Sequence, residues 1–347
     1  MKYRRLGCTG VYVSELCLGA MTFGGTGIFE AIGGLGQSEA DALVHRSLDA
    51  GINFFDTANV YSVGQSEELL GKALGARRSD VIVATKVRGR MGEGPNEIGL
   101  SRVHIMQQCD ASLRRLGTDY IDLYQIHGHD PVTDIAETLL ALTDLVRTGK
   151  VRYIGCSNLT AWQLMKSLGI SRQHGLAEFI STQSYYSIAG RELEREMLPL
   201  VEDQGLAVLP WSPLAGGFLT GKFTRDHETD PNARRVTFDF PPIDKNRGFD
   251  IVDVMAEVAT AHGVSVAQIA LAWLLHRPGV TSVIIGAKRL DQLDDNLNSV
   301  TVSLSDQELD RLNSVSALPV EYPEWMQIMQ TDREPGTARD WDRFTKK

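Results

Sequence analysis

The sequence predicts an α/β protein built as a single (β/α)8 TIM barrel, with an N-terminal β-hairpin and long loops at the C-terminal face. Eight short apolar stretches of strand length alternate with helix-length amphipathic stretches. Most of the strand-like stretches are apolar throughout, as in parallel sheets that are covered on both faces. Barrels of roughly 250 residues or more routinely form one domain. We therefore expect the chain of 347 residues to be one barrel domain over residues 1–347, with a C-terminal tail at 313–347.

The expected elements follow one another in pairs. An alternating pattern over residues 3–13 predicts a hairpin that closes the amino-terminal end of the barrel. Strands are expected near residues 14–19, 52–56, 81–86, 121–126, 151–156, 179–182, 207–211 and 281–285. Helices are expected near residues 38–50, 66–74, 102–116, 134–148, 160–168, 192–204, 252–275 and 289–299. Ser38 is the expected N-cap of the first helix. The pattern at 252–275 predicts two helices, because Gly263 interrupts it and Ser265 can cap a new one.

A doubly wound open sheet of the Rossmann type is the alternative fold. Glycines precede the first long helix, and Asp56 follows about 20 residues later, as in a dinucleotide-binding unit. However, the motif G-x-G-x-x-G is absent, and eighteen residues separate Gly19 from the helix. The motif needs a tight turn at that place, so the closed barrel is favoured.

The composition is that of an ordinary globular protein, with 43% hydrophobic and 23% charged residues. The 35 basic and 44 acidic residues give a net charge of −9, which argues against nucleic acid or an anionic membrane as a partner. No signal-peptide segment and no membrane-spanning stretch is apparent, so we expect a cytoplasmic protein. Cys8, Cys17, Cys109 and Cys156 lack Cys-x-x-Cys spacing and are expected to be reduced core thiols. No histidine pair has the spacing of a metal site on a strand end.

Four residues with reactive side chains follow the strand-like stretches. Asp56, Lys86 and His127 come directly after three successive apolar runs, and Tyr61 follows Asp56 by five residues. Each alone has a structural explanation, such as a helix cap, a solvated strand end or a core side chain. At neighbouring strand ends of a parallel barrel, the four together predict a catalytic site for acid–base chemistry.

The local sequences FFDTANVY, VATKV and YQIH around these residues resemble those of the aldo-keto reductases. The active site of that family is a tetrad of Asp, Tyr, Lys and His, which Asp56, Tyr61, Lys86 and His127 match in order, and the likeness covers about residues 3–312. It implies an NADP-dependent oxidoreductase acting on CH-OH and carbonyl groups. Gly128 after His127 departs from the pattern by its small size and leaves the substrate contacts at that position open.

Tyr61 is the expected general acid of a carbonyl reduction, which needs a hydride for carbon and a proton for oxygen. A phenol has a pKa of about 10, and we expect the charge of Lys86 to lower it towards neutrality. Asp56 is expected to keep Lys86 protonated and in place. His127 is expected to orient the carbonyl by a hydrogen bond, and His129 is the less suitable alternative because it does not continue the strand directly.

Two segments after the last two strands have the character of phosphate-binding loops in barrels. They are residues 211–222 and residues 285–296. In the second, Lys288 and Arg289 are expected in the first turn of a helix, where the helix dipole disfavours cations. A bound anion would explain two positive charges at that end.

The family resemblance implies which residues bind NADP(H). The expected contacts are Ser157, Asn158 and Gln183 to the nicotinamide carboxamide, Trp211 stacked on the ring, Ser212, Leu214, Gly216 and Lys222 at the pyrophosphate, and Gly286, Lys288, Gln292, Asp295 and Asn296 around the adenosine, with Gly19 and Met21 completing the set. The 2′-phosphate would lie on Lys288, with a second basic contact from Arg234 or Arg235. Asn158 and Gln183 can also be strand-end caps.

The sequence thus predicts the reversible, NADPH-dependent reduction of an aldehyde or ketone to an alcohol. The partner is then a small-molecule carbonyl or alcohol. The voltage-gated potassium-channel β-subunits, which share the fold and similar cofactor loops, give the alternative of a cofactor-binding regulatory protein with little turnover. Loops 20–37 and 212–249 are long for a barrel and are expected to arch over its mouth. The tail either folds over the mouth as a third wall or packs against the flank.

Overall fold

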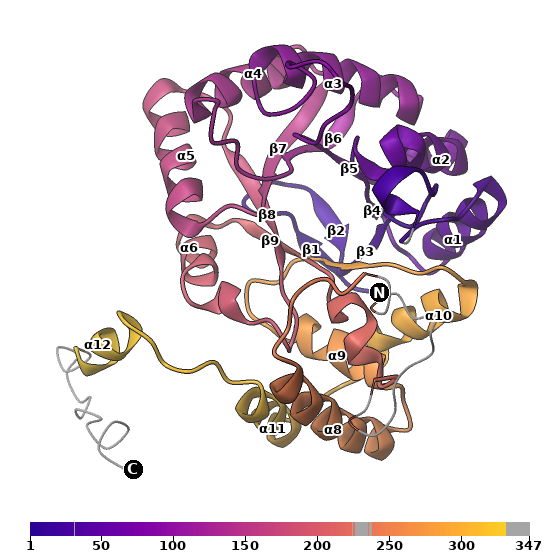
Figure 1. Cartoon of the computed structure of the whole chain (residues 1–347), viewed down its shortest axis with the longest axis vertical. Helices are drawn as coiled ribbons and strands as arrows, with labels where there is room; N and C mark the ends of the chain where they lie inside the picture. The colour runs from indigo at the N-terminus through magenta and orange to yellow at the C-terminus, as the bar shows by residue number, and fades with distance from the viewer. Residues whose placement is uncertain (31, 224, 226–234, 236–237, 331–347) are drawn as a thin grey trace.

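The structure is a computed structural model and describes residues 1–30, 32–223, 225, 235 and 238–330 (Figure 1). Its centre is a parallel sheet whose strands lie in the order β10 (Val283–Ile285), β3 (Leu16–Gly19), β4 (Phe54–Asp56), β5 (Ile82–Val87), β6 (Ile121–Ile126), β7 (Val151–Ser157), β8 (Phe179–Tyr185) and β9 (Ala207–Trp211). A parallel bridge between Val208 and Val280 joins the two ends of this order. The sheet therefore closes into a barrel, as predicted.

Helices cover the outside of the barrel (Figure 1). In chain order they are α1 (Gln37–Asp49), α2 (Gln65–Leu74), α3 (Arg102–Leu116), α4 (Ile135–Arg147), α5 (Ala161–His174), α6 (Met197–Gln204), α8 (Lys245–His262), α9 (Val266–Leu275), α10 (Leu290–Asn298) and α11 (Asp306–Val315). Their apolar sides and the outward faces of the strands form one large buried cluster. Burial of this apolar surface is the main stabilising contribution to the fold.

Capping residues confirm one predicted helix boundary and correct another. Gly263 ends α8 with a φ of 65°, and the Ser265 side chain accepts from the Gln268 N–H at the start of α9. The predicted break into two helices is thus confirmed. Ser38 is not an N-cap, because α1 already begins at Gln37, and Gly36 precedes it. The helix predicted at 192–204 begins instead as a 3-10 turn, η4 (Glu192–Glu194), before α6.

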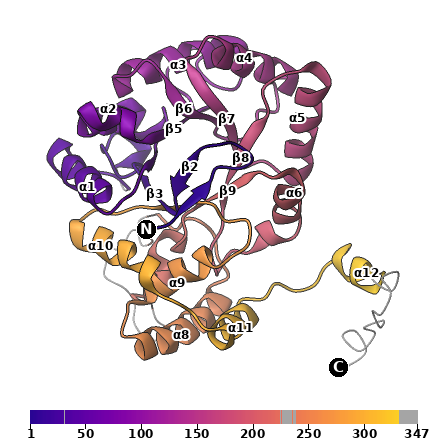
Figure 2. The same cartoon turned by 180° about the vertical axis from the view of Figure 1, so that it is seen from behind.

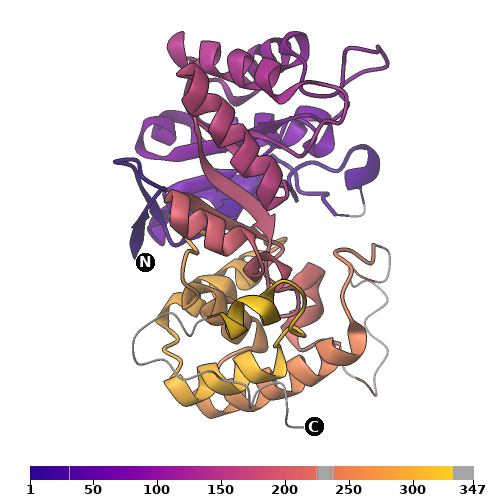
Figure 3. The ribbon, with the colours of Figure 1, turned by 90° about the vertical axis from the view of Figure 1, so that its left-hand side faces the viewer.

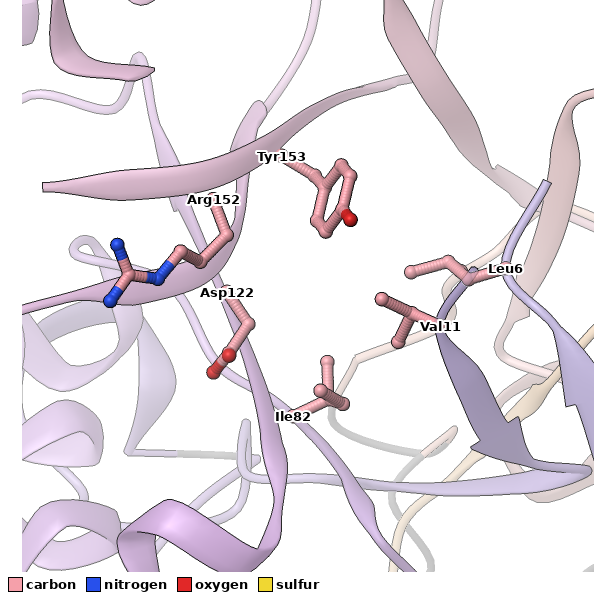
Figure 4. Close-up of a pocket in the computed structure, with 6 residues that line it drawn as sticks. All are labelled: Leu6, Val11, Ile82, Asp122, Arg152 and Tyr153. Atoms are coloured by element: carbon pink, nitrogen blue, oxygen red, sulfur yellow. The ribbon is translucent and has the colours of Figure 1, made fainter. Parts of the chain in front are cut away.

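The amino-terminal hairpin closes one end of the barrel, as predicted. Its strands β1 (Tyr3–Arg5) and β2 (Tyr12–Ser14) are antiparallel, and Figure 2 shows them across the barrel end that faces the viewer. Leu6 and Val13 pack against Phe54 and Leu123 in the barrel interior. A cavity of about 300 Å³ remains at this end, lined by Leu6, Val11, Ile82, Asp122, Arg152 and Tyr153 (Figure 4). The opposite end carries the two long loops (Figure 3).

Three of the four cysteines are buried and reduced, as expected, whereas Cys8 is exposed and is no core residue. Its thiol lies in the hairpin and donates to the Gly205 carbonyl at 3.1 Å. Over the described residues, no single helix is long and apolar enough to cross a membrane. The pair α8 and α9 has that length and apolarity only together, and the two helices are bent by 97° at their junction.

The described part of the tail does not reach the mouth of the barrel. Arg195 donates to the Pro319 carbonyl at 3.1 Å and forms ion pairs with Glu321 and Glu324. The last described helix, α12 (Glu324–Met329), then lies outside the ring of helices (Figure 1). Up to residue 330, the tail is therefore a feature of the flank, and residues 331–347 lie outside the described part.

Candidate active site

Asp56, Tyr61 and Lys86 form one hydrogen-bonded cluster at the carboxyl end of the barrel. The Lys86 Nζ donates to Asp56 Oδ1 at 2.6 Å and to the Thr57 carbonyl at 2.8 Å. It also donates to the Tyr61 hydroxyl at 3.3 Å and lies 4.9 Å from the centre of that ring. The Lys86 side chain is fully buried. All three N–H groups of the ammonium therefore have protein partners.

A strained turn brings Tyr61 back to Lys86. Tyr61 opens the 3-10 segment η2 (Tyr61–Gly64), in which Ser62 and Val63 have φ values of 49° and 55°. Left-handed backbone is rare for residues other than Gly and is costly for a β-branched residue. Such strain is common near functional sites. Here the turn connects β4 to α2 while leaving the Tyr61 hydroxyl beside the ammonium.

Two amide side chains hold the second oxygen of Asp56. Gln125 Nε2 donates to Asp56 Oδ2 at 3.2 Å, and Gln183 Nε2 donates to the same atom at 2.8 Å. Both glutamines are buried, as is Asp56. The carboxylate thus accepts bonds from β5, β6 and β8, which fix its orientation.

His127 lies beside Tyr61, directly after the end of β6. The two rings meet edge-on, with their centres 5.7 Å apart, and the His127 backbone N–H donates to the Val87 carbonyl at 2.9 Å. Burial, with the positive charges of Lys86 and Arg88, lowers the pKa of His127 to about 3. The imidazole is therefore neutral at physiological pH and can donate one hydrogen bond without a charge. His129 is exposed and lies farther from the strand end.

The net effect of the surroundings on Tyr61 is opposite to the sequence-based expectation. Burial raises the pKa of Tyr61, and the lowering effect of the Lys86 charge does not outweigh it, partly because Asp56 raises the pKa as well. Burial would lower the pKa of Lys86, but the negative charge of Asp56 and the hydrogen bonds to Asp56 and Tyr61 raise it overall. At neutral pH the site therefore holds a protonated phenol next to an ammonium.

Both long loops contribute to the mouth, as predicted. From loop 20–37, Phe29 packs edge-on against Tyr61 at 5.4 Å between ring centres, and Ile32 belongs to the same apolar cluster. From loop 212–249, Phe240 stacks on Trp211 with an angle of 9° between the rings. The mouth around the Tyr61 hydroxyl is therefore largely apolar and aromatic.

The residues expected at the nicotinamide lie together at the ends of β7, β8 and β9. Ser157 and Gln183 are register partners in adjacent strands. The buried Ser157 Oγ has no hydrogen-bond partner in the described part of the chain. Asn158, in a left-handed conformation with φ 55°, donates to the His127 carbonyl at 3.2 Å and accepts from Trp211 Nε1 at 3.0 Å. Asn158 is thus a bridge between strand ends, and the Ser157 hydroxyl remains available for a ligand.

The loop after β9 forms a tightly wound cradle. Ser212 and Ala215 have φ values of 52° and 47°, and Gly216 and Gly217 have values of 66° and 95°. A side chain at Gly216 would collide with the Phe240 carbonyl, so only Gly fits there. Lys222, expected at the pyrophosphate, is exposed, and Leu214 is half-buried.

Arg235 is not a free basic contact for a phosphate. It is buried, donates to the carbonyls of Ala215 and Pro241 at 2.6 and 2.9 Å, and pairs with Asp239. Its guanidinium therefore joins Ala215, soon after β9, to the segment 239–241. Arg234, the other residue considered for this role, lies outside the described residues.

The segment after β10 differs from the expectation in two respects. α10 begins at Leu290 with Arg289 as its N-cap, so Lys288 and Arg289 precede the first turn. Arg289 is paired with Asp291 at 2.8 Å, which removes it from the predicted unpaired double charge. Gly286 and Lys288 are exposed, and the Lys288 N–H donates to Gln292 Oε1 at 2.9 Å.

One acidic and one amide residue of this segment, Asp295 and Asn296, already have hydrogen-bond partners in the protein. Asp295 accepts from Ser265 Oγ at 2.8 Å and from Gln268 Nε2 at 2.6 Å. Asn296 donates to the Gly286 carbonyl at 3.2 Å. Asp295 therefore joins α10 to α9, while Asn296 supports the turn at Gly286. Of the remaining expected contacts, Gly19 is buried at the end of β3, and Met21 packs near Tyr61.

Comparison with known proteins shows the family of the chain. The model of the Aldo/keto reductase family matches residues 15–317. The chain belongs to the aldo/keto reductase family. The family resemblance inferred from the sequence motifs is confirmed, and membership makes the chain an oxidoreductase of carbonyl groups in general terms.

Similar members of the family have different names. Versiconal hemiacetal acetate reductase of Aspergillus parasiticus is 37% identical, over 90% of this chain and 96% of the relative. The uncharacterized oxidoreductase YrpG of Bacillus subtilis is also 37% identical, over 91% of this chain and 96% of the relative. A probable voltage-gated potassium channel subunit beta of Oryza sativa subsp. japonica is 36% identical over the same shares. Both classes weighed from the sequence thus occur among aldo/keto reductase relatives.

The sequence-based reasoning missed Gln125, Phe29 and Arg88. Gln125 could have been found, because it is an amide near the end of β6, two residues before His127 and on the same side of the strand. Phe29 and Arg88 lie in loops, where no periodicity predicts which side chain turns towards the site.

Proposed function

We propose that this aldo/keto reductase reduces aldehydes or ketones to alcohols with NADPH, and that it can catalyse the reverse oxidation. The single observation that carries the proposal is the contact of the Lys86 ammonium with both Asp56 at 2.6 Å and Tyr61 at 3.3 Å. An ammonium held by a buried carboxylate against a phenol has the composition of a proton-donating site. A structural ion pair alone would not need the phenol.

In this proposal Tyr61 gives its proton to the carbonyl oxygen as the alcohol forms. The raised pKa of Tyr61 keeps the phenol protonated at neutral pH, which is the form that reduction needs. The adjacent Lys86 charge stabilises the phenolate left behind. His127, which stays neutral because its pKa is about 3, donates a hydrogen bond that orients the carbonyl oxygen. Asp56 keeps Lys86 charged and in place.

The residues present fit a nicotinamide dinucleotide. The unpartnered Ser157 hydroxyl suits the carboxamide, and Gln183 keeps its carbonyl oxygen for the same group while its Nε2 is on Asp56. The glycines of the cradle after β9 allow a pyrophosphate to approach the backbone. Lys222 and Lys288 supply positive charge near it, with Lys288 as our choice for the 2′-phosphate. When bound, the nicotinamide supplies the hydride.

The test replaces the acid and nothing else. Tyr61→Phe should lower kcat for a generic aldehyde by about 10²- to 10⁴-fold, the usual contribution of a general acid, with little change in the Kd of NADPH. Tyr153→Phe is the matched control, because Tyr153 lies at the closed end of the barrel (Figure 4) and should leave both quantities unchanged. A Tyr61→Phe protein that keeps more than about a tenth of the wild-type kcat would exclude Tyr61 as the acid.

The second candidate function is a cofactor-binding subunit with little turnover, favoured by the relatives named as channel subunits. Stopped-flow mixing of the NADPH-bound protein with an aldehyde separates the two. Oxidation of the bound NADPH followed by repeated turnover supports the enzyme. Tight binding of NADPH without turnover of any aldehyde in a broad panel would favour the subunit. We keep a cytoplasmic location as part of the proposal.

A further inference from the structure

We propose that Arg88 binds an anionic group of the substrate, so that the preferred substrates are aldehydes or ketones that carry a carboxylate or a similar anion a few bonds from the carbonyl. This inference rests on the proposed function and adds a substrate class to it. Arg88 lies directly after β5, two residues beyond Lys86.

Arg88 fills the space that Gly128 leaves open beside His127. A side-chain carbon at Gly128 would lie 3.6 Å from Arg88 Cδ and 3.7 Å from Arg88 Nε, which is ordinary van der Waals contact. The arginine therefore lies across the backbone that immediately follows His127. The missing bulk at position 128 is explained: the neighbouring loop provides the side chain.

One bond fixes the orientation of the guanidinium. Arg88 Nε donates to the His129 carbonyl at 2.8 Å, and the Arg88 carbonyl accepts from the Gly99 N–H at 2.9 Å. The backbone at Arg88 has a φ of 153°, which is rare outside Gly and is typical of functional positions. An arginine held at both ends in this way is preorganised to bind a ligand.

The two terminal amino groups of Arg88 have no hydrogen-bond or ion-pair partner within the described residues, unlike Arg115 with Glu67 or Arg78 with Asp122. The residue is only half-exposed, and its charge is close enough to lower the pKa of His127. The two terminal nitrogens form a planar edge that matches a carboxylate, a phosphate or a sulfate.

The geometry then selects molecules with two ends. The carbonyl must reach Tyr61 and His127, while the anion must reach the guanidinium across Gly128. Phe29 packs edge-on against Tyr61, so an apolar group next to the carbonyl suits the site. An uncharged carbonyl compound can still reach Tyr61 but leaves Arg88 without a partner.

The test compares 4-oxobutanoate with its methyl ester, two aldehydes with the same carbon skeleton that differ in the charge and in one ester methyl group. In the wild type, kcat/KM should be about 10- to 100-fold higher for the acid, the worth of one or two charge-assisted hydrogen bonds. Arg88→Leu should remove this preference. Its kcat/KM for the ester should stay within about threefold of the wild-type value. The matched control is Arg90→Leu, which removes the same charge from the same loop at an exposed residue that donates to the Gly92 and Gly94 carbonyls. It should keep the preference.

Three results would overturn the assignment. In the first, the wild type uses the ester as well as the acid. In the second, Arg88→Leu lowers kcat/KM equally for the acid and the ester, which would mean that Arg88 only supports His127. In the third, Arg90→Leu removes the preference as fully as Arg88→Leu, which would reduce the effect to general charge attraction.

Failure of the proposed function gives a different pattern, because the wild type with bound NADPH would then turn over neither compound. Calorimetric titration of 4-oxobutanoate into the NADP⁺-bound protein still decides the role of Arg88 in that case. A Kd that rises at least about tenfold in Arg88→Leu supports an anion site. An equal Kd in both proteins excludes it.

Discussion

Replacing Lys86 by Met tests whether the centre of the site is a buried ion pair. The Lys86 side chain is 0% exposed and that of Asp56 is 4% exposed. Lys86→Met retains most of the volume but leaves Asp56 Oδ1 and the Thr57 carbonyl without their donor. Removing one member of a buried pair costs about 3–5 kcal/mol, because the other charge stays buried without compensation. At about 2 °C per kcal/mol for a chain of this size, Tm should fall by about 6–10 °C.

The assay is urea unfolding followed by tryptophan fluorescence, with the midpoint and slope compared between variants. The matched control is Arg77→Met. Arg77 and Asp80 are also 2.6 Å apart, but their side chains are 57% and 52% exposed, so the loss should stay below about 1 kcal/mol.

The double variant Asp56→Asn/Lys86→Met separates the ion pair from the chemistry. Removing both charges should recover at least about half of the lost stability, since no lone charge remains buried. The double variant should have no turnover, like Lys86→Met, because the phenolate of Tyr61 would lack its cation in both. A loss below about 1 kcal/mol in Lys86→Met, or a double variant no more stable than Lys86→Met, would refute the reasoning.

Three further predictions concern Gln125, the pH dependence of reduction and the choice of coenzyme at Lys288. Gln125→Leu removes one of two amide donors to Asp56 Oδ2, so it should lower kcat by about tenfold, the worth of a charge-assisted bond, with an unchanged Kd for NADPH; steady-state kinetics with fluorescence titration checks both. The kcat/KM for reduction should be level from pH 5 to pH 8, since the pKa of His127 is about 3 and that of Tyr61 is raised above its usual value; His127 is neutral above its pKa and Tyr61 protonated below its own, so a step near pH 6.5 would contradict both assignments. Lys288→Ala should raise KM for NADPH about tenfold and leave NADH almost untouched, and the effect should shrink with salt; equal losses for both coenzymes would leave the NADPH preference without a residue behind it.

Much of the fold could be predicted from the sequence because the barrel depends on repeated, local patterns. The runs around Leu123 and Leu209 predicted their strands to the residue, since apolar stretches bounded by polar ones leave little choice. Caps at Ser265 and Gly263 are equally local. The predicted N-cap at Ser38 was wrong, because the helix already begins at Gln37, after Gly36.

The site was predictable where strand order alone decides it and unpredictable where loops do. Asp56 and Lys86 end neighbouring strands, so their meeting follows from the parallel sheet. The raised pKa of Tyr61 could not be predicted from the sequence, because the sequence shows the nearby charges but not the degree of burial that outweighs them. Nor could the sequence show that Arg289 is paired with Asp291 or that Arg88 lies across Gly128, since such contacts depend on loop conformation.

The bonds around Asp56 also bear on how the family can change during evolution. Its carboxylate accepts from three other strands of the barrel, through Lys86, Gln125 and Gln183, so these residues brace the barrel from inside. A descendant that lost its chemistry would still be selected against losing one member of the pair, because an unpaired charge at its centre would lower the abundance of the folded protein. An Asp and a Lys at these positions are therefore weak indicators of turnover in any one member. Tyr61 donates no bond to Asp56, so selection for the brace alone would not preserve its hydroxyl.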